Sequence, residues 1–392
     1  MRTSWREVEL DDVATELTVG HVGPMVTEYR DRGIPFIRST DIEPFRINRS
    51  ELKFINPDFH AKLKKSALRP GDVVIVRTGK PGTAAVIPEE LPDANCSDVV
   101  IVRTAPELDP HYLVYYVNSS GRAHVNAHSG GAVQQHFNVD AARRIRINLP
   151  PLQEQREIVD VLGALDDKIE LNRRMNATLE AMAQAVFKEW FVDGAKEEWV
   201  EKSIGDLAEV VGGATPSTKE EAFWNGAHRW ATPKDLSRLQ VPVLLDTERH
   251  LTDAGLAEIG SGLLPVGTVL MSSRAPIGYI AVAEVPTAVN QGFIAMKPKP
   301  GVSNLYLWQW AKQSMDQIKS MANGSTFLEI SKASFRPIPV RVPPTERMKA
   351  YDDLVRPMYE RLVANEREIG TLTVMRDTLL PKLMRGEIRV MQ

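Results

Sequence analysis

Two long stretches of the chain carry a row of positions at alternating spacings of three and four residues. In the first stretch the row is formed by Ile158, Leu162, Leu165, Ile169, Asn172, Asn176, Leu179, Ala183 and Val186. In the second stretch it is formed by Met358, Leu362, Asn365, Ile369, Leu372, Leu379 and Leu383. These are the a and d spacings of a heptad repeat, so each stretch predicts a long amphipathic helix. Such a helix exposes an apolar stripe when it is alone, and it therefore needs a partner.

Each stretch follows a pair of prolines, Pro150 with Pro151 and Pro343 with Pro344. The first helix, from about residue 154 to 191, would be roughly 55 Å long at 1.5 Å per residue. The nearest candidate partner of each helix is the other. We expect them to pair antiparallel and so to hold two domains apart at a fixed distance.

Two asparagines and two prolines interrupt the apolar pattern. Asn172 and Asn365 occupy equivalent positions of the two rows. A buried asparagine in a coiled coil costs stability but fixes register and orientation, and we expect this role for both residues. The alternative is that either asparagine lies on the rim of the seam and has no such role. Pro357 and Pro381 are each expected to start or kink the second helix.

The chain is an internal repeat. Residues 5–193 can be laid over residues 199–386 at an offset of 193 to 196 residues. Five blocks keep their order, among them GDVVIVRTGKPGTAAV (71–86), which matches GTVLMSSRAPIGYIAV (267–282). A period near 190 residues is far longer than a solenoid unit, so it indicates two whole domains. The predicted segments are a domain at 1–150, a helical segment at 151–194, a second domain at 195–342 and a second helical segment at 343–392.

Shorter patterns within each domain mix strands and helices. The apolar runs at 71–78, 97–104, 266–273 and 291–298 are typical of strands. Two stretches that begin after Asp109 and Ser303 have helical spacing, with these residues as candidate caps. The predicted fold class is therefore α/β, of the α+β kind: two similar domains with mostly β cores, separated by a pair of long antiparallel coiled-coil helices.

The composition is that of an ordinary soluble protein, with 43% apolar and 25% charged residues. Because there is no apolar run of 18 residues, no membrane-spanning helix is expected. The single cysteine, Cys96, and an N-terminus without an apolar signal fit a reducing cytoplasm. The formal net charge is −3, and residues 1–150 carry 19 basic and 19 acidic side chains. Binding to nucleic acid would therefore need local patches, or a partner that supplies positive charge.

Three strings resemble a known family. Residues 149–194 are similar to the central conserved region of the specificity subunits of Type I restriction–modification enzymes; they read LPPLQEQREIVDVLGALDDKIELNRRMNATLEAMAQAVFKEWFVDG. NGSTFLEISKASFRPIPVRVPP (323–344) resembles the end of a target-recognition domain, and RDTLLPKLMRGEI (376–388) the C-terminal conserved helix. The resemblance covers essentially the whole chain. The second copy departs from it, with VPPTERMKAY where the family more often has a PLxEQ run.

The resemblance implies a function in DNA recognition. The two domains would be target-recognition domains that read a bipartite, asymmetric sequence in double-stranded DNA, and the helices would set the gap between its halves. The helices would also bind two methyltransferase subunits, and the assembly leaves room for two restriction subunits that act as motor and nuclease. S-adenosylmethionine, ATP and Mg would belong to those partners, so this chain needs no cofactor. Half-sites read on one face of B-DNA lie about one helical turn apart, roughly 34–36 Å.

Loops at matched positions of the two domains carry polar residues that suit DNA contact. Arginine can bind guanine bidentately, glutamine can read adenine, and lysine can bind phosphate. The candidates are Arg38, Ser39, Thr40, Arg77, Thr78, Lys80, Gln134, Gln135 and His136 in the first domain, and Thr232, Lys234, Ser273, Arg274, Asn290, Gln291, Ser325, Thr326 and Lys332 in the second. The alternatives are a solvated turn with a capping Ser or Thr at 38–40 and 232–234, and an ordinary hairpin at 77–82 and 272–278.

Catalytic motifs are missing from the sequence. An adenine methyltransferase would need a [DNS]-P-P-[YF] loop, and NPDF (56–59) lacks the second proline. Gly79 and Lys80 are followed by Pro81, so they form no P-loop. His124, His128 and His136 lack the cysteine or acidic partners of a usual metal site. A non-catalytic subunit is therefore expected, and the competing interpretation is a coiled-coil protein-interaction scaffold without DNA readout.

Overall fold

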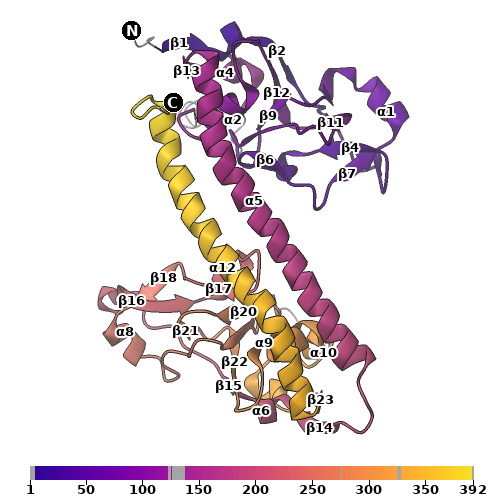
Figure 1. Ribbon diagram of the computed structural model, residues 1–392, viewed down its shortest axis with the longest axis vertical. Helices are drawn as coiled ribbons and strands as arrows, with labels where there is room; N and C mark the ends of the chain where they lie inside the picture. The colour runs from indigo at the N-terminus through magenta and orange to yellow at the C-terminus, as the bar shows by residue number, and fades with distance from the viewer. Residues whose placement is uncertain (1–4, 122–124, 126–136, 275, 325–327, 391–392) are drawn as a thin grey trace. The chain divides into compact units, whose positions relative to one another are not determined.

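The computed structural model describes residues 5–121, 125, 137–274, 276–324 and 328–390, and it divides into two compact units (Figure 1). Unit 1 contains residues 1–168 and 372–392, and unit 2 contains residues 169–371. Each unit therefore includes part of both long helices. The four consecutive segments predicted from the sequence divide the chain differently, and they stay a prediction.

Unit 1 is built on two sheets, the first of which has buried, β-branched central strands. The first sheet has the order β10 (Ala84–Val86), β9 (Val73–Val76), β12 (Val99–Thr104) and β2 (Ala14–Val19), all antiparallel. The second has the order β3 (Tyr29–Arg30), β7 (Lys53–Ile55), β4 (Ile34–Ile37), β11 (Ala94–Cys96) and β8 (Ala67–Leu68), in which β11 and β4 are parallel. Two short ribbons complete the unit, β1 (Arg6–Glu9) with β13 (Arg146–Leu149) and β5 (Ile42–Glu43) with β6 (Arg46–Ile47).

Short helices join these strands. They are η1 (Leu10–Val13), η2 (Ser39–Asp41), α1 (Pro57–Lys62), η3 (Lys64–Ser66), α2 (Pro110–Asn118) and α4 (Val139–Arg143). Asp109 caps α2, because its carboxylate accepts hydrogen bonds from the backbone N–H of His111 and Tyr112. This confirms the cap predicted from the sequence.

Unit 2 repeats this plan. Its larger sheet has the order β15 (Ala208–Val211), β22 (Phe293–Pro298), β19 (Val269–Ser272), β20 (Ile280–Ala283) and β17 (Val243–Leu244). Its smaller sheet has the order β18 (Arg249–Leu251), β16 (Trp224–Ala231) and β21 (Thr287–Val289), and β14 (Val200–Ser203) pairs with β23 (Pro339–Val342). Its short helices are η4 (Glu189–Asp193), α6 (Ile204–Leu207), η5 (Glu221–Phe223), α7 (Pro233–Ser237), α8 (Asp253–Ala257), α9 (Asn304–Gln313), α10 (Met315–Ser320) and α11 (Lys332–Phe335).

The two units share their topology as well as their sequence pattern. The order β10-β9-β12-β2 of unit 1 corresponds to β20-β19-β22-β15 of unit 2, and the parallel pair of β11 and β4 corresponds to β21 and β16. Gly82 and Gly278 take positive φ angles of 81° and 110° at the same turn of the hairpin. The internal repeat and the mixed α/β fold class predicted from the sequence are thus confirmed.

The first long helix, α5, spans Leu152–Lys188, close to the predicted range. Its buried positions follow the predicted heptad, with Ile158, Leu162, Ile169 and Ala183 at most 2% exposed. The second, α12, spans Thr345–Met384. Both Pro357 and Pro381 lie inside this span, and α12 already begins at Thr345, directly after the proline pair. Neither proline therefore starts the helix, and a kink at either position stays a prediction. The seam of α12 was predicted to begin at Met358, but Met358 is only partly buried and the buried residue is its neighbour Tyr359.

In each unit α5 and α12 pair antiparallel (Figure 1). In unit 1, Arg376 of α12 binds Asp166 of α5 at 2.7 Å. In unit 2, the Phe187 ring packs edge-on against Tyr351, with 6.0 Å between ring centroids. No helix in the described part of the chain has an apolar stretch long enough to cross a membrane.

Polar residues lie buried in the helix seam of unit 2. Asn172 and Asn176 are fully buried and Asn365 is 1% exposed, so these asparagines do not lie on the rim. The Asn172 Nδ2 donates to Glu368 at 2.8 Å and the Asn365 Nδ2 donates to the Asn176 Oδ1 at 2.8 Å. Asn176 in turn donates to Glu366 at 2.7 Å. Asn172 and Asn365 thus have separate partners on the opposite helix, and we call these five residues the asparagine cluster.

Candidate nucleic-acid interface

In unit 2 the predicted loops meet at one end of the larger sheet, where β15 and β19 end and β22 begins. The Ser273 N–H donates to the Gly292 carbonyl at 2.8 Å, and the Ile330 N–H donates to the Ser273 carbonyl at 3.0 Å. The Asn290 N–H donates to the carbonyl of Ala231, which precedes Thr232, at 3.1 Å. We call this set the loop edge of unit 2; it consists of residues 212–215, 232–234, 273–274, 290–292 and 329–332.

Unit 1 has a corresponding loop edge made by the same backbone bonds. The Arg77 N–H donates to the Asp98 carbonyl at 3.3 Å, and the Phe137 N–H donates to the Arg77 carbonyl at 3.0 Å. The Ser97 N–H donates to the Ile37 carbonyl at 3.0 Å, which brings the segment after β4 to the same place. The loop edge of unit 1 consists of residues 20–21, 38–40, 77–80, 97–98 and 137.

In the segments after β4 and β16, two of the predicted side chains bind carboxylates of the same unit. The Arg38 Nε donates to the buried Asp41 carboxylate at 2.9 Å, and this hydrogen bond raises the pKa of Arg38. The Thr232 hydroxyl donates to Asp235 at 2.6 Å within a capping box. Thr232 therefore has the capping role named by the alternative interpretation, and its contact with DNA stays a prediction.

Other side chains of these segments face solvent. Thr40 is exposed and Ser39 is partly buried at the start of η2. The Lys234 ammonium, 61% exposed, lies 3.0 Å from the Glu248 carboxylate. Lys234 holds the pKa of Glu248 below its usual range, chiefly through a hydrogen bond.

The hairpins after β9 and β19 carry cations that differ in their exposure and in their contacts with neighbouring residues. Arg77 is 20% exposed, and its guanidinium donates to the Phe137 carbonyl at 3.2 Å. Lys80 is exposed and has no ion-pair partner in the part of the chain that the structure describes. Ser273 is 3% exposed, so only its backbone takes part in the edge. Thr78 is partly buried, and Arg274 lies 3.6 Å from the Glu329 carboxylate.

The remaining candidates flank these hairpins. The Asn290 side chain closes its own turn by accepting from the Gly292 N–H at 2.8 Å, and the Gln291 side chain accepts from the Thr215 hydroxyl at 2.6 Å. Lys332 is exposed at the start of α11, and its ammonium lies so near Gly212 that a Cβ there would be 3.0 Å away. The candidates outside the described residues are Gln134, Gln135, His136, Ser325 and Thr326.

The structure adds edge residues that the sequence pattern did not single out. Glu329 and Thr215 contact predicted residues of unit 2, and Asp98 lies 4.0 Å from Arg77 in unit 1. His21 joins the edge of unit 1 through its N–H, which donates to the Cys96 carbonyl at 2.8 Å. The order of the repeat blocks alone would have indicated Glu329, because it directly precedes a residue that matches Phe137.

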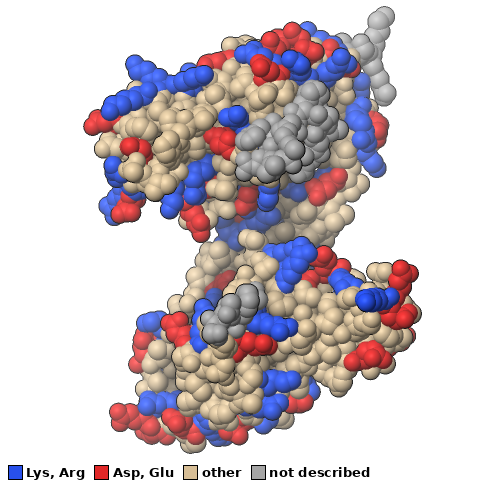
Figure 2. Space-filling model, turned by 180° about the vertical axis from the view of Figure 1, so that it is seen from behind, with Lys and Arg blue, Asp and Glu red and all other residues tan. Residues whose placement is uncertain are grey.

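Each edge carries a small excess of cations, and several of these cations are already paired with carboxylates. Arg38, Lys234 and Arg274 each lie within ion-pair distance of a carboxylate. On the face shown in Figure 2, lysines and arginines are interspersed with acidic residues over both units. The edges therefore suit recognition by specific side chains better than general attraction to phosphate.

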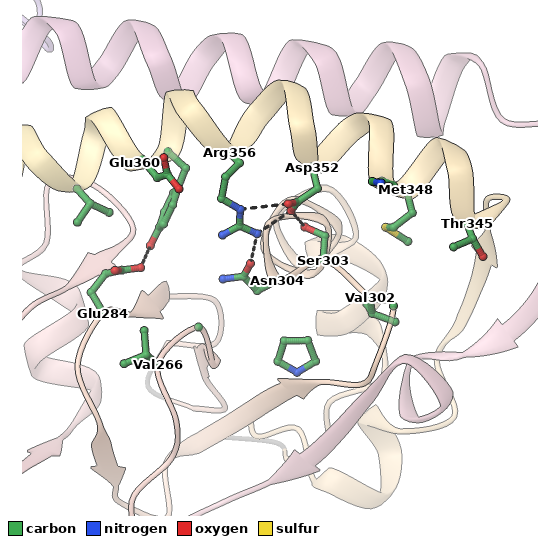
Figure 3. Close-up of a pocket in the computed structure, with 16 residues that line it drawn as sticks. Val266, Glu284, Val302, Ser303, Asn304, Thr345, Met348, Asp352, Arg356 and Glu360 are labelled. Atoms are coloured by element: carbon green, nitrogen blue, oxygen red, sulfur yellow. Dashed lines mark hydrogen bonds and ion pairs between the residues drawn. The ribbon is translucent and has the colours of Figure 1, made fainter.

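A pocket of about 740 Å³ lies at the other end of the larger sheet of unit 2, between α12 and the strand ends (Figure 3). Arg356 of α12 binds Asp352 at 2.7 Å and Asn304 at 2.8 Å, and the Tyr359 hydroxyl donates to Glu284 at 2.8 Å. These groups form hydrogen bonds and an ion pair with one another, and the bonds to Asn304 and Glu284 hold α12 against the rest of unit 2. Among the described residues, no group of three or more His, Cys, Asp or Glu is placed to hold a metal ion.

The chain is similar to known specificity subunits. A family model described as "Type I restriction modification DNA specificity domain" matches residues 3–181 and again 196–354. The MjaIX specificity subunit of Methanocaldococcus jannaschii is 37% identical over 178 residues, which are 43% of this chain and 41% of that protein. The HindI specificity subunit of Haemophilus influenzae is 23% identical over 98% of this chain and 100% of its own length.

A solved structure agrees with these relatives at the level of the fold. The S subunit of a Type I restriction–modification system from M. genitalium superposes with a TM-score of 0.59 at 17% identity, over 99% of this chain and 97% of its own. The two matches to the family model cover most of the chain and fall on the two halves of the internal repeat. The chain therefore belongs to the family of the Type I restriction modification DNA specificity domain.

Proposed function

We propose that this chain is the sequence-reading subunit of a Type I restriction–modification complex, in which each loop edge reads one half of a bipartite DNA target. The observation that carries the proposal is a shared backbone frame with different side chains on it. The bond from Phe137 to Arg77 in unit 1 recurs as the bond from Ile330 to Ser273 in unit 2. A frame that stays constant while its exposed residues change is suited to reading two different sequences.

The segments and site residues predicted from the sequence enter this proposal. Residues 1–150 and 195–342 act as the two recognition domains, and the DNA contacts come from the candidates of the two loop edges. Lys80 and Lys332 are exposed cations suited to phosphate, whereas the predicted contacts at Thr232 and Ser273 are limited to their backbones.

The partners are two methyltransferase subunits, and the surface of the helices supports two equal docking sites. Arg174, Thr178 and Met182 lie one turn apart on an exposed face of α5, and the same residues recur on α12 as Arg367, Thr371 and Met375. Met182 is 45% exposed and Met375 is 47% exposed. Since exposed positions of a diverged repeat have no packing reason to stay alike, we assign this repeated face to a partner that binds twice.

A mutation of each methionine tests the docking face. Met182→Glu and Met375→Glu should each reduce the number of methyltransferase subunits per chain from two to one, as measured by native mass spectrometry. Met321→Glu is the matched control, because Met321 is 44% exposed in unit 2 but lies outside both long helices. Two bound partners in both helix variants would refute the docking face.

The helix pair also sets the gap between the half-sites, and the asparagine cluster fixes the register in which the two helices pair. If the helices slid by one heptad, Asn365 would face Ile169 or Ala183 instead of Asn176. A buried amide without a partner costs roughly 1–3 kcal/mol.

Catalysis, together with S-adenosylmethionine, ATP and Mg, belongs to the partner subunits. Because the target is chromosomal or invading DNA, the complex works in the cytoplasm.

DNA binding with and without the partner tests the proposed function. The chain alone should bind DNA weakly, because residues 1–150 carry no net charge and several cations at the loop edges are paired with carboxylates. Site-specific binding should appear when the methyltransferase is added. A gel-shift assay with labelled duplexes compares the two conditions. Methyl transfer from S-adenosylmethionine by the purified single chain, or assembly with the partner but no sequence preference, would refute the proposal; the second result would favour an interaction scaffold.

A further inference from the structure

Arg274 and Glu329 form an exposed ion pair at the loop edge of unit 2. The Arg274 Nη1 lies 3.6 Å from the Glu329 Oε2, and the two side chains are 39% and 47% exposed. An ion pair this exposed contributes little to stability, so the fold alone gives no strong reason for it.

The backbone beneath the pair is fixed on both sides. Glu329 and Asn323 exchange two backbone hydrogen bonds of 2.9 Å each, and the following residue, Ile330, donates to the Ser273 carbonyl at 3.0 Å. Arg274 and Glu329 also form an isolated β-bridge. The backbone that carries both side chains is therefore held in place, and the reading of a base edge requires side chains on a fixed backbone.

The two positions differ together between the repeats. Arg274 matches Thr78 of unit 1, and Glu329 precedes Ile330 as His136 precedes Phe137. The backbone bond that joins the two segments is the same in both units, as described above. A joint change on a constant frame marks the positions at which the two half-sites would be told apart.

The chemistry of the pair matches one base pair. In the major groove, guanine offers two acceptors, O6 and N7, to an arginine, and cytosine offers its N4 amino group to a carboxylate. A carboxylate next to the arginine repels backbone phosphate, so this pair suits a base edge better than the DNA backbone. Building on the proposed function, we propose that Arg274 and Glu329 together read one G·C pair in the half-site of unit 2.

Competition with altered duplexes tests this assignment on the complex of the chain and its methyltransferase. Each base pair of the second half-site is replaced in turn. For the wild type, one G·C replacement should weaken binding roughly 5- to 160-fold, the equivalent of about 1–3 kcal/mol. Glu329→Ala and Arg274→Ala should remove most of that discrimination and leave the discrimination at the first half-site unchanged. Arg274→Lys, which keeps the charge but loses the rigid fork of the guanidinium, should weaken the preference for guanine.

The control is Glu209→Ala, which breaks an exposed pair with Lys297 at the opposite end of β22 and should change no preference. Full discrimination at every position of the second half-site in all three pair variants would overturn the assignment and leave the proposed function intact. A wild-type complex that discriminates at neither half-site would overturn the proposed function, and the assignment with it.

Discussion

Exposed cations at the loop edges are the residues whose role depends least on neighbouring side chains. Lys80 and Lys332 should each neutralise one phosphate, so Lys80→Ala or Lys332→Ala should weaken binding to all duplexes alike. The slope of log affinity against log salt concentration should fall by about one for each variant. Lys297→Ala, at the far end of β22, is the control. Titrations over a range of salt concentrations would refute the assignment if neither slope changed.

Glu366 makes the helix seam sensitive to pH. Burial raises the pKa of this carboxyl above its ordinary value, although Asn176 donates a hydrogen bond to it. The folded state thus favours the protonated form, and the seam loses stability as pH rises through the raised pKa. Glu366→Gln keeps an acceptor for Asn176 without the charge. Its melting temperature should exceed that of the wild type at neutral pH, and the difference should shrink toward pH 4.

The exposed Glu346 near the start of the same helix provides the matched control, Glu346→Gln. Thermal unfolding of the three proteins between pH 4 and 8 makes the comparison. A difference between Glu366→Gln and the wild type that stays constant across this range would show that the charge of Glu366 does not limit the seam.

Single residues were the hardest to predict from sequence. The polar character of 38–40 and 232–234 was visible, but not that Asp41 and Asp235 would bind Arg38 and Thr232. Such short-range carboxylate contacts depend on the turn geometry, which the sequence pattern does not fix. The repeat places Glu329 at the position of the candidate His136, but its contact with Arg274 joins segments far apart in the chain and was not predictable from the sequence pattern.

At the scale of elements, periodicity carried most of the information. The heptad rows predicted α5 and α12 and the pairing of the two helices, because only a paired helix can bury such a stripe. Their antiparallel direction was a separate expectation, which the stripe itself does not supply. Pro357 does not start the helix, since α12 keeps its tertiary contacts on both sides of this residue through Tyr351 and Tyr359. Packing against the sheet outweighs the loss of one backbone hydrogen bond there.

Matched insertions test the helices as a spacer. Four residues added after Lys168 in α5 and four after Thr371 in α12 fall at the boundary between the units, so each unit keeps its internal contacts. Each insertion adds about one turn, roughly 6 Å. At about 3.4 Å per base pair, the gap in the target should grow by one or two base pairs with unchanged half-sites.

The insertion in α5 alone is the control for this experiment, because it lengthens one helix of an antiparallel pair and should prevent assembly. The methylated motif of each variant, read by sequencing, gives the gap. An unchanged gap in a stable double-insertion variant would show that the helices bind partners without setting the spacing.

For the whole molecule, the duplication was the decisive feature of the sequence. Five matched blocks predicted two domains of one topology, and β10-β9-β12-β2 and β20-β19-β22-β15 show that topology twice. The sequence did not predict that the loops of each unit would meet at a single edge, because hydrogen bonds such as that from Ile330 to Ser273 join distant segments. The central claim follows from that edge: each unit reads its own half of the target.

Exchange of residues 1–150 for the first domain of another specificity subunit tests this claim most directly. The wild type and the chimaera are each expressed with the methyltransferase, and the methylated motif is determined by single-molecule sequencing of host DNA. We predict a bipartite motif with a fixed gap for the wild type, and for the chimaera a motif in which one half is new while the other half and the gap are retained. A wild-type motif without a gap, or a chimaera in which both halves change, would contradict the account.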